Sequence, residues 1–531
     1  MSKKLPSIIV TGASGIVGRN FLEAVKDNFL IYAIARRSQK EAGILPHKNI
    51  KWIQVDIGNW ISLRWVMHNI KREGGADYIL HLAGYYDFEY TPNIEYERTN
   101  IKGTKYMLEQ AKILRVKRFI FASSSAASEF PESGEVLTEK SPLDAPYDYA
   151  LSKKEGEKMV KEFSKFFPCS IVRFAAVFTD CCEYGPLYVF LSTWLEKQWN
   201  SRMLGGKGNS AIPYIHTNDL NRLMLIILNK TRTLPDFDIY LASPDGSINH
   251  KELFDVATKF FYGTKIRPFM MPKFLAYPGV IMRDLLGRIT GHRPFERPWM
   301  IKYLDKKLEI DSSYTRKALG WEPTKRLSIL RRLLYLIEKM KSDPSTWHSR
   351  NKIALKRDTL RPNLLVYNSI NRLKDEIIED VLDKLFSQLD DLDLDNYKKM
   401  DRANLERDIE FFIQLLAVSV RTRDRMILLD YGRKLAYKRN SEGFTREEVS
   451  LAVTEMGKII LKKISEDKDL KVNKQDIYDL ISITLQMTVD EIADSFEKVL
   501  LKQSIDSVYN RDEIEKRIDD LESYYNPSKP E

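Results

Sequence analysis

Two side chains four residues apart, Tyr149 and Lys153, have the types and spacing for proton-transfer chemistry. They lie in the segment YALSK (149–153), and in a helix this spacing puts both on one face. A free tyrosine phenol titrates near pH 10, about three units above neutrality. Ionising it at neutral pH therefore costs a free energy of roughly 4 kcal/mol. A single cation at about 4 Å supplies energy of that order at an effective dielectric constant near 20. Lys153 could therefore activate Tyr149 as a base, although the pair alone also fits a solvated helix face.

A run of hydroxyl groups, Ser123, Ser124 and Ser125, follows the apolar segment RFIFA (118–122). If that segment is a parallel strand, the serines lie at the sheet edge where such sheets bind ligands. Transfer of a hydride to or from a carbonyl carbon requires a proton at the carbonyl oxygen and a group that holds this oxygen in place. The sequence therefore predicts that a serine, a tyrosine and a lysine converge beside a redox cofactor.

The segment IIVTGASGIVG (8–18) supplies a candidate site for that cofactor. An apolar strand-like run enters a turn with Gly12, Gly15 and Gly18, and a helical pattern begins at Arg19. Glycines allow close approach of the backbone to a pyrophosphate, and the helix N-terminus attracts its charge. The spacing is GxxGxxG rather than the commoner GxGxxG, so an ordinary strand-to-helix turn is the alternative.

The elements that must position these residues alternate between strand and helix patterns. Predicted strands are Ile8–Val10, Ile31–Ala35, Trp52–Val55, Tyr78–Leu82, Arg118–Ala122 and Ser170–Phe174, with amphipathic segments such as Asn100–Leu114 between them. This alternation is typical of an α/β fold with a parallel sheet covered by helices on both faces. We expect a Rossmann-type doubly wound sheet with a small substrate-binding subdomain, followed by an all-α C-terminal domain.

Changes in composition suggest the domain boundaries. We expect a catalytic domain over residues 1–341, with a cofactor part at about 1–183 and a substrate part mostly at 184–341. A polar linker is expected at 342–363, an α-helical bundle at 364–524 and a tail at 525–531. The bundle region contains almost no glycine or proline, and its apolar residues recur at helical spacing.

The overall composition narrows the class of protein. The 531 residues are 43% hydrophobic and 30% charged, with a formal net charge of +10 and no concentrated basic arm. We therefore expect a globular protein without a nucleic-acid partner. Three cysteines without metal-ligand spacing favour a reducing compartment and no metal site. Without a signal-peptide core or a membrane-spanning apolar run, a cytoplasmic location is expected.

Several ordered segments together resemble the extended short-chain dehydrogenase/reductase superfamily, in its nucleotide-sugar epimerase/dehydratase and 3β-hydroxysteroid dehydrogenase branch. The resemblance covers about residues 1–335. Its segments are TGASGIVG (11–18), VDI (55–57), HLAG (81–84), TNIKGT (99–104), ASSSAA (122–127), YALSK (149–153), VRFAAVF (172–178), YIHTNDL (214–220) and LGWEP (319–323).

The resemblance implies roles for individual residues. Tyr149 resembles the catalytic base, Lys153 its partner, and Ser125 the catalytic serine. The cofactor contacts that it implies are Gly12, Ser14, Gly15, Ile16, Gly18, Arg36, Arg37, Asp56, Ile57, Leu82, Ala83, Gly84, Asn100, Ser123, Ser124, Tyr149, Lys153, Phe174, Ala176 and Val177.

Three positions depart from the family pattern and make a transfer of substrate identity unsafe. Gly84 stands where a second alanine is usual. Ser128-Glu129-Phe130 replace the tyrosine-glycine pair that often follows the serines. The usual Gly-Pro pair is displaced to Gly185-Pro186.

The predicted second strand is followed by Arg36 and Arg37 rather than by an acidic residue. An acidic residue there would bind the 2′-hydroxyl of NAD, whereas arginine suits the 2′-phosphate of NADP. We expect NADP, with NAD as the alternative.

The substrate end is apolar. Segments 184–200 and 268–303 are rich in aliphatic and aromatic residues, which favours a hydrophobic or lipid-like small-molecule substrate but also fits ordinary core. Arg267, Arg288, Arg293 and Arg297 could still bind a phosphate. A peripheral membrane contact through Phe274–Ile289 and a homo-oligomer are further expectations.

The helical half contains a visible capping signal, in which Thr445 precedes Glu448 by three residues. Residues of about 365–505 loosely resemble the N-terminal sensor-like domain of stressosome-type regulators. That resemblance implies a regulatory or dimerisation module, and a helical extension that packs on the catalytic domain is the alternative.

Three functions fit these observations. The first is an NAD(P)-dependent oxidoreductase that acts on an alcohol or ketone. The second is a nucleotide-sugar epimerase or dehydratase that recycles its cofactor. The third is an NADP(H)-binding redox sensor, in which the helical domain responds to the redox state of the bound cofactor.

Overall fold

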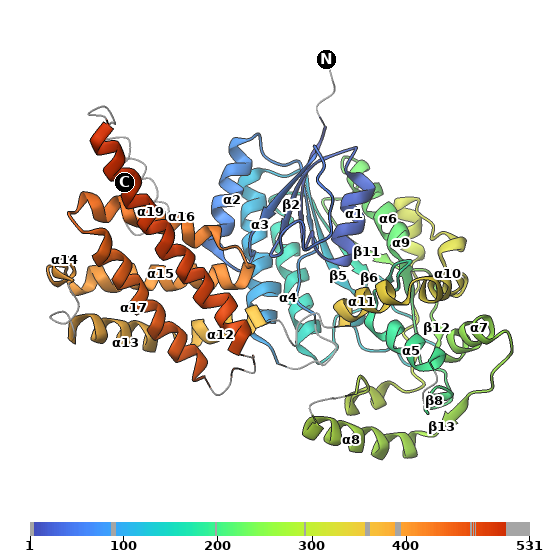
Figure 1. Ribbon diagram of the computed structural model, residues 1–531. Helices are drawn as coiled ribbons and strands as arrows, with labels where there is room; N and C mark the ends of the chain where they lie inside the picture. The colour runs from blue at the N-terminus through green and yellow to red at the C-terminus, as the bar shows by residue number, and fades with distance from the viewer. Residues whose placement is uncertain are drawn as a thin grey trace. The chain divides into compact units, whose positions relative to one another are not determined.

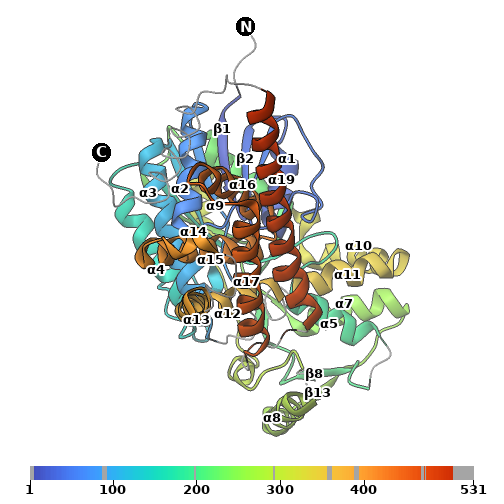
Figure 2. The same ribbon diagram turned by 60° about the vertical axis from the view of Figure 1, so that its left-hand side comes forward.

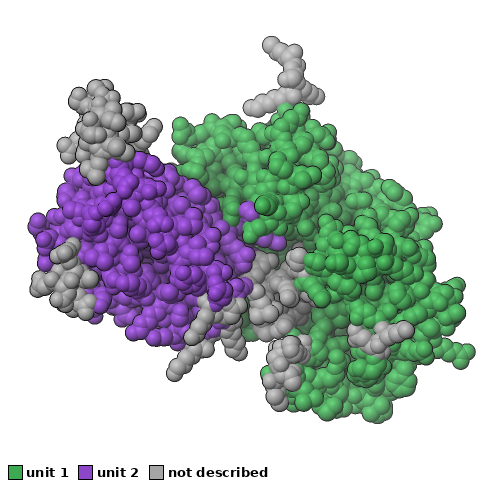
Figure 3. Space-filling model, in the orientation of Figure 1, with its two compact units in different colours: residues 1–35, 39–359 green, residues 36–38, 360–531 purple. Residues whose placement is uncertain are grey.

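The computed structural model describes residues 5–86, 92–196, 199–290, 294–355, 362–387, 394–467, 470, 472 and 474–505. The chain forms two compact units (Figure 3). The first unit contains residues 1–35 and 39–359, and the helical unit contains residues 36–38 and 360–531. Each unit is described by itself below.

The first unit is built on a seven-stranded parallel sheet (Figure 1). The strand order is β11-β6-β5-β4-β1-β2-β3, so the direction of chain progression reverses between β1 and β4. The strands are β1 (Ser7–Thr11), β2 (Leu30–Ala35), β3 (Ile50–Gln54), β4 (Tyr78–His81), β5 (Arg118–Ser124), β6 (Cys169–Phe174) and β11 (Phe237–Ala242). This is the Rossmann-type sheet that the alternating pattern predicts, and its reversal point is where such sheets bind ligands.

Helices cover both faces of the sheet, so both faces are buried. Successive side chains of each strand point to opposite faces and therefore enter different cores. In β1, Ile8 and Val10 belong to one apolar core, and Ile9 belongs to the other. Helices α1 (Ile16–Val25), α6 (Thr217–Asn229) and α9 (Ser313–Leu319) contribute to the first core. Helices α2 (Trp60–Arg72), α3 (Gly103–Leu114) and α4 (Asp148–Phe163) contribute to the second.

The remaining elements of the first unit form a smaller part around a third core. Besides η1 (Tyr96–Lys102) and η2 (Ser125–Ala127), which contact α4, they are β7 (Ala176–Phe178), α5 (Gly185–Leu195), β8 (Met203–Gly205), β9 (Ala211–Ile212), β10 (Tyr214–His216), β12 (Ile248–Asn249), α7 (His250–Tyr262), β13 (Phe269–Met271), α8 (Lys273–Thr290), η3 (Pro298–Tyr303), η4 (Lys325–Leu327), α10 (Ile329–Ser342) and α11 (Pro344–Leu355). Side chains of α5, α7, α10 and α11 fill this core.

Two features of the first unit differ from the sequence-based expectations. The cofactor part does not end near residue 183, because β11 pairs with β6 and supplies the seventh strand of the sheet. The expected linker at 342–363 contains helix α11, whose Trp347 is buried in the third core. The polar composition of this segment favoured a linker, although one aromatic residue, Trp347, anchors it in the core.

The helical unit contains only helices among its described residues (Figure 2). They are α12 (Pro362–Arg372), α13 (Lys374–Ser387), α14 (Asp395–Lys398), α15 (Arg402–Thr422), α16 (Met426–Ser441), α17 (Arg446–Ser465), α18 (Lys474–Ile477), η5 (Tyr478–Ser482) and α19 (Ile483–Ile505). The predicted cap of α17 is confirmed: Thr445 and Glu448 form a reciprocal capping box. One continuous apolar core joins these helices.

None of the helices, over the part of the chain that the structure describes, has the length and apolar character needed to cross a bilayer.

Candidate active site

The glycine turn after β1 has the shape of a pyrophosphate cradle. Gly12 has a φ of +68°, and a Cβ atom there would lie 2.8 Å from the backbone of Leu82 and Ala83. A Cβ atom on Gly18 would clash with the carbonyl oxygen of Gly12. Gly15 begins α1 without a side-chain cap, and the first turn of α1 has no acidic residue. Its free N–H groups and the helix dipole therefore suit the diphosphate of a dinucleotide.

A buried histidine fixes the loop that follows β4. The His81 ring lies between the hydroxyls of Thr11, at 2.8 Å, and Thr104, at 3.0 Å. Thr11 in turn accepts a hydrogen bond from the N–H of Ala83. Burial lowers the pKa of His81 to about 3, so the ring is neutral at physiological pH. His81 thus positions the wall beside the glycine turn and does not exchange protons.

Tyr149 and Lys153 lie one turn apart on α4. The Lys153 ammonium nitrogen donates a 2.7 Å hydrogen bond to the carbonyl oxygen of Ala122 and lies 5.8 Å from the centre of the Tyr149 ring. Burial lowers the pKa of Lys153 to about 8, and the nearby Glu157 carboxylate opposes this shift. The ring of Tyr86 stacks edge-on against Tyr149 with 4.6 Å between centroids. The phenol is therefore held near a buried amine.

Ser125 begins the short helix η2 at the end of β5. It is 2% exposed, and its hydroxyl has no hydrogen-bond partner among the described residues. Leaving a buried hydroxyl unsatisfied costs about 1–3 kcal/mol, so such a group is expected to have a partner when the site is in use. Of the three serines, Ser125 is the one whose hydroxyl is available for an incoming oxygen.

The other two serines serve local structure. Ser123 donates a 2.6 Å hydrogen bond to Glu157, which also receives a two-pronged ion pair from Arg173 at 2.8–2.9 Å. The side chain of Ser124 accepts a hydrogen bond from the N–H of Ala126. Both residues nevertheless line the cavity described below.

Asn100 connects the loop after β4 to α4. Its amide donates to the carbonyl of Tyr85 at 3.0 Å and to the hydroxyl of Ser152 at 2.9 Å, while its oxygen accepts from the N–H of Tyr85. Ser152 then donates to the carbonyl of Tyr149 at 2.7 Å. The buried Asn100 therefore holds the helix that carries the tyrosine and does not itself line the cavity.

A cavity of about 920 Å³ joins the predicted chemical groups to the smaller part of the first unit. Its lining includes Ser125, Tyr149 and Lys153 together with residues of α8 and η3. Apolar and aromatic side chains dominate the rest of the lining, including Phe190, Trp194, Trp199, Met271 and Leu304. The structure thus opens the three catalytic candidates to an apolar chamber large enough for a small-molecule substrate.

The predicted cofactor residues fall into two groups. Those that line the cavity are Ile16, Leu82, Gly84, Ser123, Ser124, Tyr149, Lys153, Phe174, Ala176 and Val177. Those that lie elsewhere are Gly12, Ser14, Gly15, Gly18, Arg36, Arg37, Asp56, Ile57, Ala83 and Asn100. Asp56 is buried and pairs with Arg98 at 2.8 Å. Every one of the twenty except Asn100, Tyr149 and Lys153 lies on β5, at the last residue of β6, or after the carboxyl end of β1, β2, β3, β4 or β6.

Of the four arginines proposed for phosphate binding, Arg288 and Arg297 both pair with Asp284, at 3.0 and 3.8 Å. Arg297 lines the cavity, whereas Arg267 and Arg288 do not. Arg293 lies outside the described residues.

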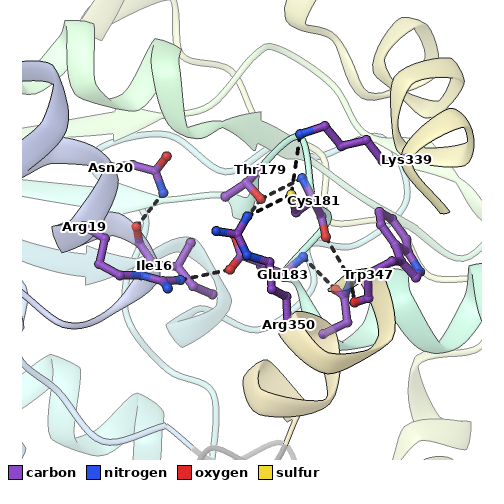
Figure 4. A network of polar contacts seen from close by, with 10 residues as sticks. Ile16, Arg19, Asn20, Thr179, Cys181, Glu183, Lys339, Trp347 and Arg350 are labelled. Atoms are coloured by element: carbon purple, nitrogen blue, oxygen red, sulfur yellow. Dashed lines mark hydrogen bonds and ion pairs between the residues drawn. The ribbon is translucent and has the colours of Figure 1, made fainter. Parts of the chain in front are cut away.

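A polar network ties α11 to the start of α1 (Figure 4). Glu183 pairs with Arg19 at 2.9 Å, and its N–H donates to Asn351 of α11 at 2.8 Å. Asn351 also donates to the carbonyl of Cys181, whose sulfur accepts a hydrogen bond from Arg350. Cys182 and Glu183 both have positive φ values in this turn. The network holds the carboxylate of Glu183 against the first turn of the predicted cofactor helix.

Sequence reasoning missed three contributors to the site. Tyr86 packs on Tyr149, Glu157 anchors Ser123, and Asn351 orders the turn at Glu183. Only Glu157 had a visible signal, since it follows Lys153 by four residues on the same face of a predicted helix.

Comparison with known proteins agrees with this geometry. Residues 8–242 match the model of the NAD dependent epimerase/dehydratase family. This part of the chain is therefore similar to that family. The resemblance drawn from the ordered sequence segments is thereby confirmed over residues 8–242. The sensor-like resemblance of the helical unit stays a prediction.

Two of the curated relatives illustrate the range of the family. A dTDP-D-glucose 4,6-dehydratase from Dictyostelium discoideum is 24% identical over 253 residues, which are 43% of this chain and 56% of the relative. A UDP-glucose 4-epimerase from Vibrio cholerae is 24% identical over 343 residues, 61% of this chain and 93% of the relative. The chain spans only 51–59% of the length of the first three curated relatives that it matches.

Solved structures show the same fold. UDP-glucose 4-epimerase from Thermotoga maritima, determined with UDP-glucose, superposes with a TM-score of 0.50 at 18% identity and covers 64% of this chain and 100% of its own. dTDP-glucose 4,6-dehydratase from Bacillus anthracis, determined with NAD, gives 0.50 at 16% identity over 65% of this chain and 99% of its own.

Proposed function

We propose that the first unit is an NAD(P)-dependent enzyme of the epimerase type, which transfers a hydride to and from a hydroxyl-bearing carbon of a small-molecule substrate. The buried hydroxyl of Ser125 carries this proposal, because it is unpartnered among the described residues and lines the same cavity as Tyr149 and Lys153. The names of the relatives, nucleotide-sugar epimerases and dehydratases, support the same chemistry.

The three side chains have complementary tasks in this proposal. The Tyr149 phenolate takes the proton from the substrate hydroxyl as a carbonyl forms, and the resulting phenol returns it in the reverse direction. The Lys153 ammonium stabilises the phenolate by its charge. The Ser125 hydroxyl donates a hydrogen bond to the substrate oxygen and holds it in place. NAD(P) bound at the glycine turn would supply the acceptor for the hydride.

The wall beside Ser125 favours hydride exchange over loss of water. Elimination of water requires an acid and a base near the substrate. Ala126 and Ala127 follow the serine directly, and Ser128 donates to the carbonyl of Pro142. Glu129 is bound by Lys302 and Tyr303. Because Ser128 and Glu129 are both engaged in these contacts, neither is assigned as a second proton-transfer group, and epimerisation is proposed over dehydration.

A specific observation supports a second candidate, net oxidation or reduction of an apolar alcohol or ketone. The chamber beyond the catalytic groups is walled by side chains such as Phe190, Trp194 and Met271. An apolar chamber of this kind favours a substrate with a hydrophobic body. In this version the cofactor would be released after each turnover rather than recycled.

The choice of cofactor belongs to the same proposal. Arg36 and Arg37 follow the end of β2 directly. A charge-assisted hydrogen bond from a guanidinium group to a 2′-phosphate is worth about 1.5–3 kcal/mol. We therefore propose that NADP binds more tightly than NAD. Replacement of Arg36 by Asp should reverse the order of the two dissociation constants.

The test is turnover by the purified protein with nucleotide sugars and NAD(P). UDP-glucose, UDP-galactose and dTDP-glucose are each followed by proton NMR for a change at the sugar carbons and at 340 nm for net cofactor reduction. A new epimer without net cofactor reduction supports the main proposal. Stoichiometric cofactor reduction with an apolar alcohol in place of the nucleotide sugar supports the second candidate.

The matched control is Tyr149→Phe, which removes only the hydroxyl. It should lower turnover at least about 1,000-fold while cofactor binding changes less than about threefold. Unchanged turnover in Tyr149→Phe would exclude both versions of the proposal.

A further inference from the structure

Helix α8 has an unusual surface for a protein exposed only to water. Six of its large apolar side chains are exposed, from 49% to 74%: Phe274, Leu275, Tyr277, Met282, Leu285 and Leu286. The helix lies at the margin of the first unit next to β13 and β8, away from the seven-stranded sheet in both views (Figures 1 and 2). Among the elements of that unit, η3 packs against it. An exposed apolar patch of this density marks an interaction site.

The same helix forms a wall of the catalytic cavity. Ala276, Gly279 and Val280 line the chamber that Tyr149 also lines. Leu275 and Met282 line the chamber and are also 49% and 59% exposed. Trp199, which is 79% exposed, lines the chamber as well. The exposed patch and the inner apolar surface are therefore continuous.

The charges around the patch are positive. Residues 262–288 contain five basic residues, Lys265, Arg267, Lys273, Arg283 and Arg288, and one acidic residue. The acidic residue, Asp284, is buried and pairs with Arg288 on its own helix. Glu296, which follows α8 in the chain, is 40% exposed and pairs with Arg283 at 3.6 Å. The surface of α8 thus presents apolar side chains with an excess of cations over carboxylates.

This combination suits the interface of an anionic lipid bilayer. Apolar side chains of a surface helix enter the acyl boundary, while Lys and Arg bind the headgroups. A second copy of the chain is a poorer partner. A two-fold interface would place the same patch on both sides and bring Lys273 and Arg288 toward their own counterparts. Exposed tryptophan such as Trp199 is also typical of the membrane interface.

We propose that α8 docks the protein on an anionic lipid surface, with the mouth of the catalytic cavity facing the lipid. Phe274, Tyr277, Leu285 and Leu286 provide the inserted side chains, and none of them lines the cavity. If the proposed function also holds, the bilayer supplies the hydrophobic part of the substrate directly to the chamber.

The test is co-sedimentation of the full chain with vesicles of phosphatidylcholine alone or with about 30 mol% phosphatidylglycerol. The full chain should sediment with the anionic vesicles, and salt should weaken the binding because it screens the charges. Binding is measured without substrate, so its outcome is independent of the catalytic proposal.

A double variant, Phe274→Asp with Leu286→Asp, should lower the vesicle partition coefficient at least about tenfold. The control is Leu45→Asp, because Leu45 is 82% exposed in the same unit but does not line the cavity. The control should bind vesicles within about twofold of the unaltered chain. Far-ultraviolet circular dichroism establishes that all three proteins are folded.

Three results would overturn the proposal. The first is absence of the unaltered chain from the anionic vesicle pellet. The second is equal vesicle binding by the double variant. The third is a dimer in sedimentation velocity that the double variant abolishes, since this would assign the patch to a second copy of the chain.

Discussion

At the scale of single residues, the buried amine of Lys153 sets the working range of the proposed chemistry. Its pKa is lowered to about 8 by burial, so the group is charged below that pH and neutral above it. Only the charged form stabilises the Tyr149 phenolate. Cofactor-dependent turnover should therefore decline as the pH rises through about 8, which a pH–rate profile measures. Lys153→Arg keeps the charge and should move that decline to higher pH; a decline unmoved by Lys153→Arg would contradict this role.

Gly18 provides a residue-scale test of the cofactor cradle. A methyl group at Gly18 would meet the carbonyl oxygen of Gly12 and the backbone of Ala13. Gly18→Ala should weaken NADP binding at least about tenfold, because the turn must open to relieve the clash. The dissociation constant is measured by fluorescence titration. Gly279→Ala is the control, since nothing lies within 4 Å of its added methyl group. Equal affinity in both variants would mean that the dinucleotide does not bind at this turn.

Much of the site can be predicted from local spacing because its residues follow strand ends. Tyr149, Lys153 and Ser125 line one cavity as expected, since two share a helix face and the third follows a parallel strand. Asn351 could not be predicted in this way. It comes from a segment about 170 residues beyond the turn that it orders, and only tertiary packing brings the two together.

At the scale of elements, helix α11 stabilises the turn that supports the start of α1. Asn351 is fully buried and makes three hydrogen bonds, which join Glu183, Cys181 and its own helix. Asn351→Ala would leave buried backbone groups unsatisfied. It should lower the free energy of unfolding by about 1–3 kcal/mol.

Chemical denaturation followed by circular dichroism measures this loss. The comparison variant is Ser342→Ala in the preceding helix, whose side chain bonds only to a nearby backbone carbonyl. An Asn351→Ala protein as stable as Ser342→Ala would show that α11 is not required to hold the turn.

The individual strands of the sheet could be predicted from the sequence to different degrees. The first six strands were predicted within a few residues because each is a short apolar run bounded by polar or glycine-rich turns. Strand β11 was not, because DIYLA (238–242) lies in a region of irregular pattern, and only its pairing with β6 makes it part of the sheet. Pairing partners distant in sequence leave no local periodicity.

At the scale of the whole molecule, the two units have separate apolar cores. The helical unit is held by side chains such as Leu416, Val453 and Ile492, none of which belongs to a core of the first unit. We expect two calorimetric unfolding transitions. NADP should raise the midpoint of the first unit's transition the most, because that unit carries the glycine turn proposed for the pyrophosphate.

Differential scanning calorimetry of the full chain with and without NADP measures both midpoints. Tyr149→Phe should show the same pair of transitions and the same shift. A single transition that NADP raises as a whole would mean that the units unfold as one body.

The measurement that tests the account most directly is a crystal structure of the chain with NADP. We predict the pyrophosphate at Gly12–Gly18 and the nicotinamide ring in the cavity, with the Tyr149 hydroxyl and the Ser125 hydroxyl facing the carbon that accepts the hydride. A dinucleotide bound elsewhere, or a ring remote from Tyr149, would contradict it.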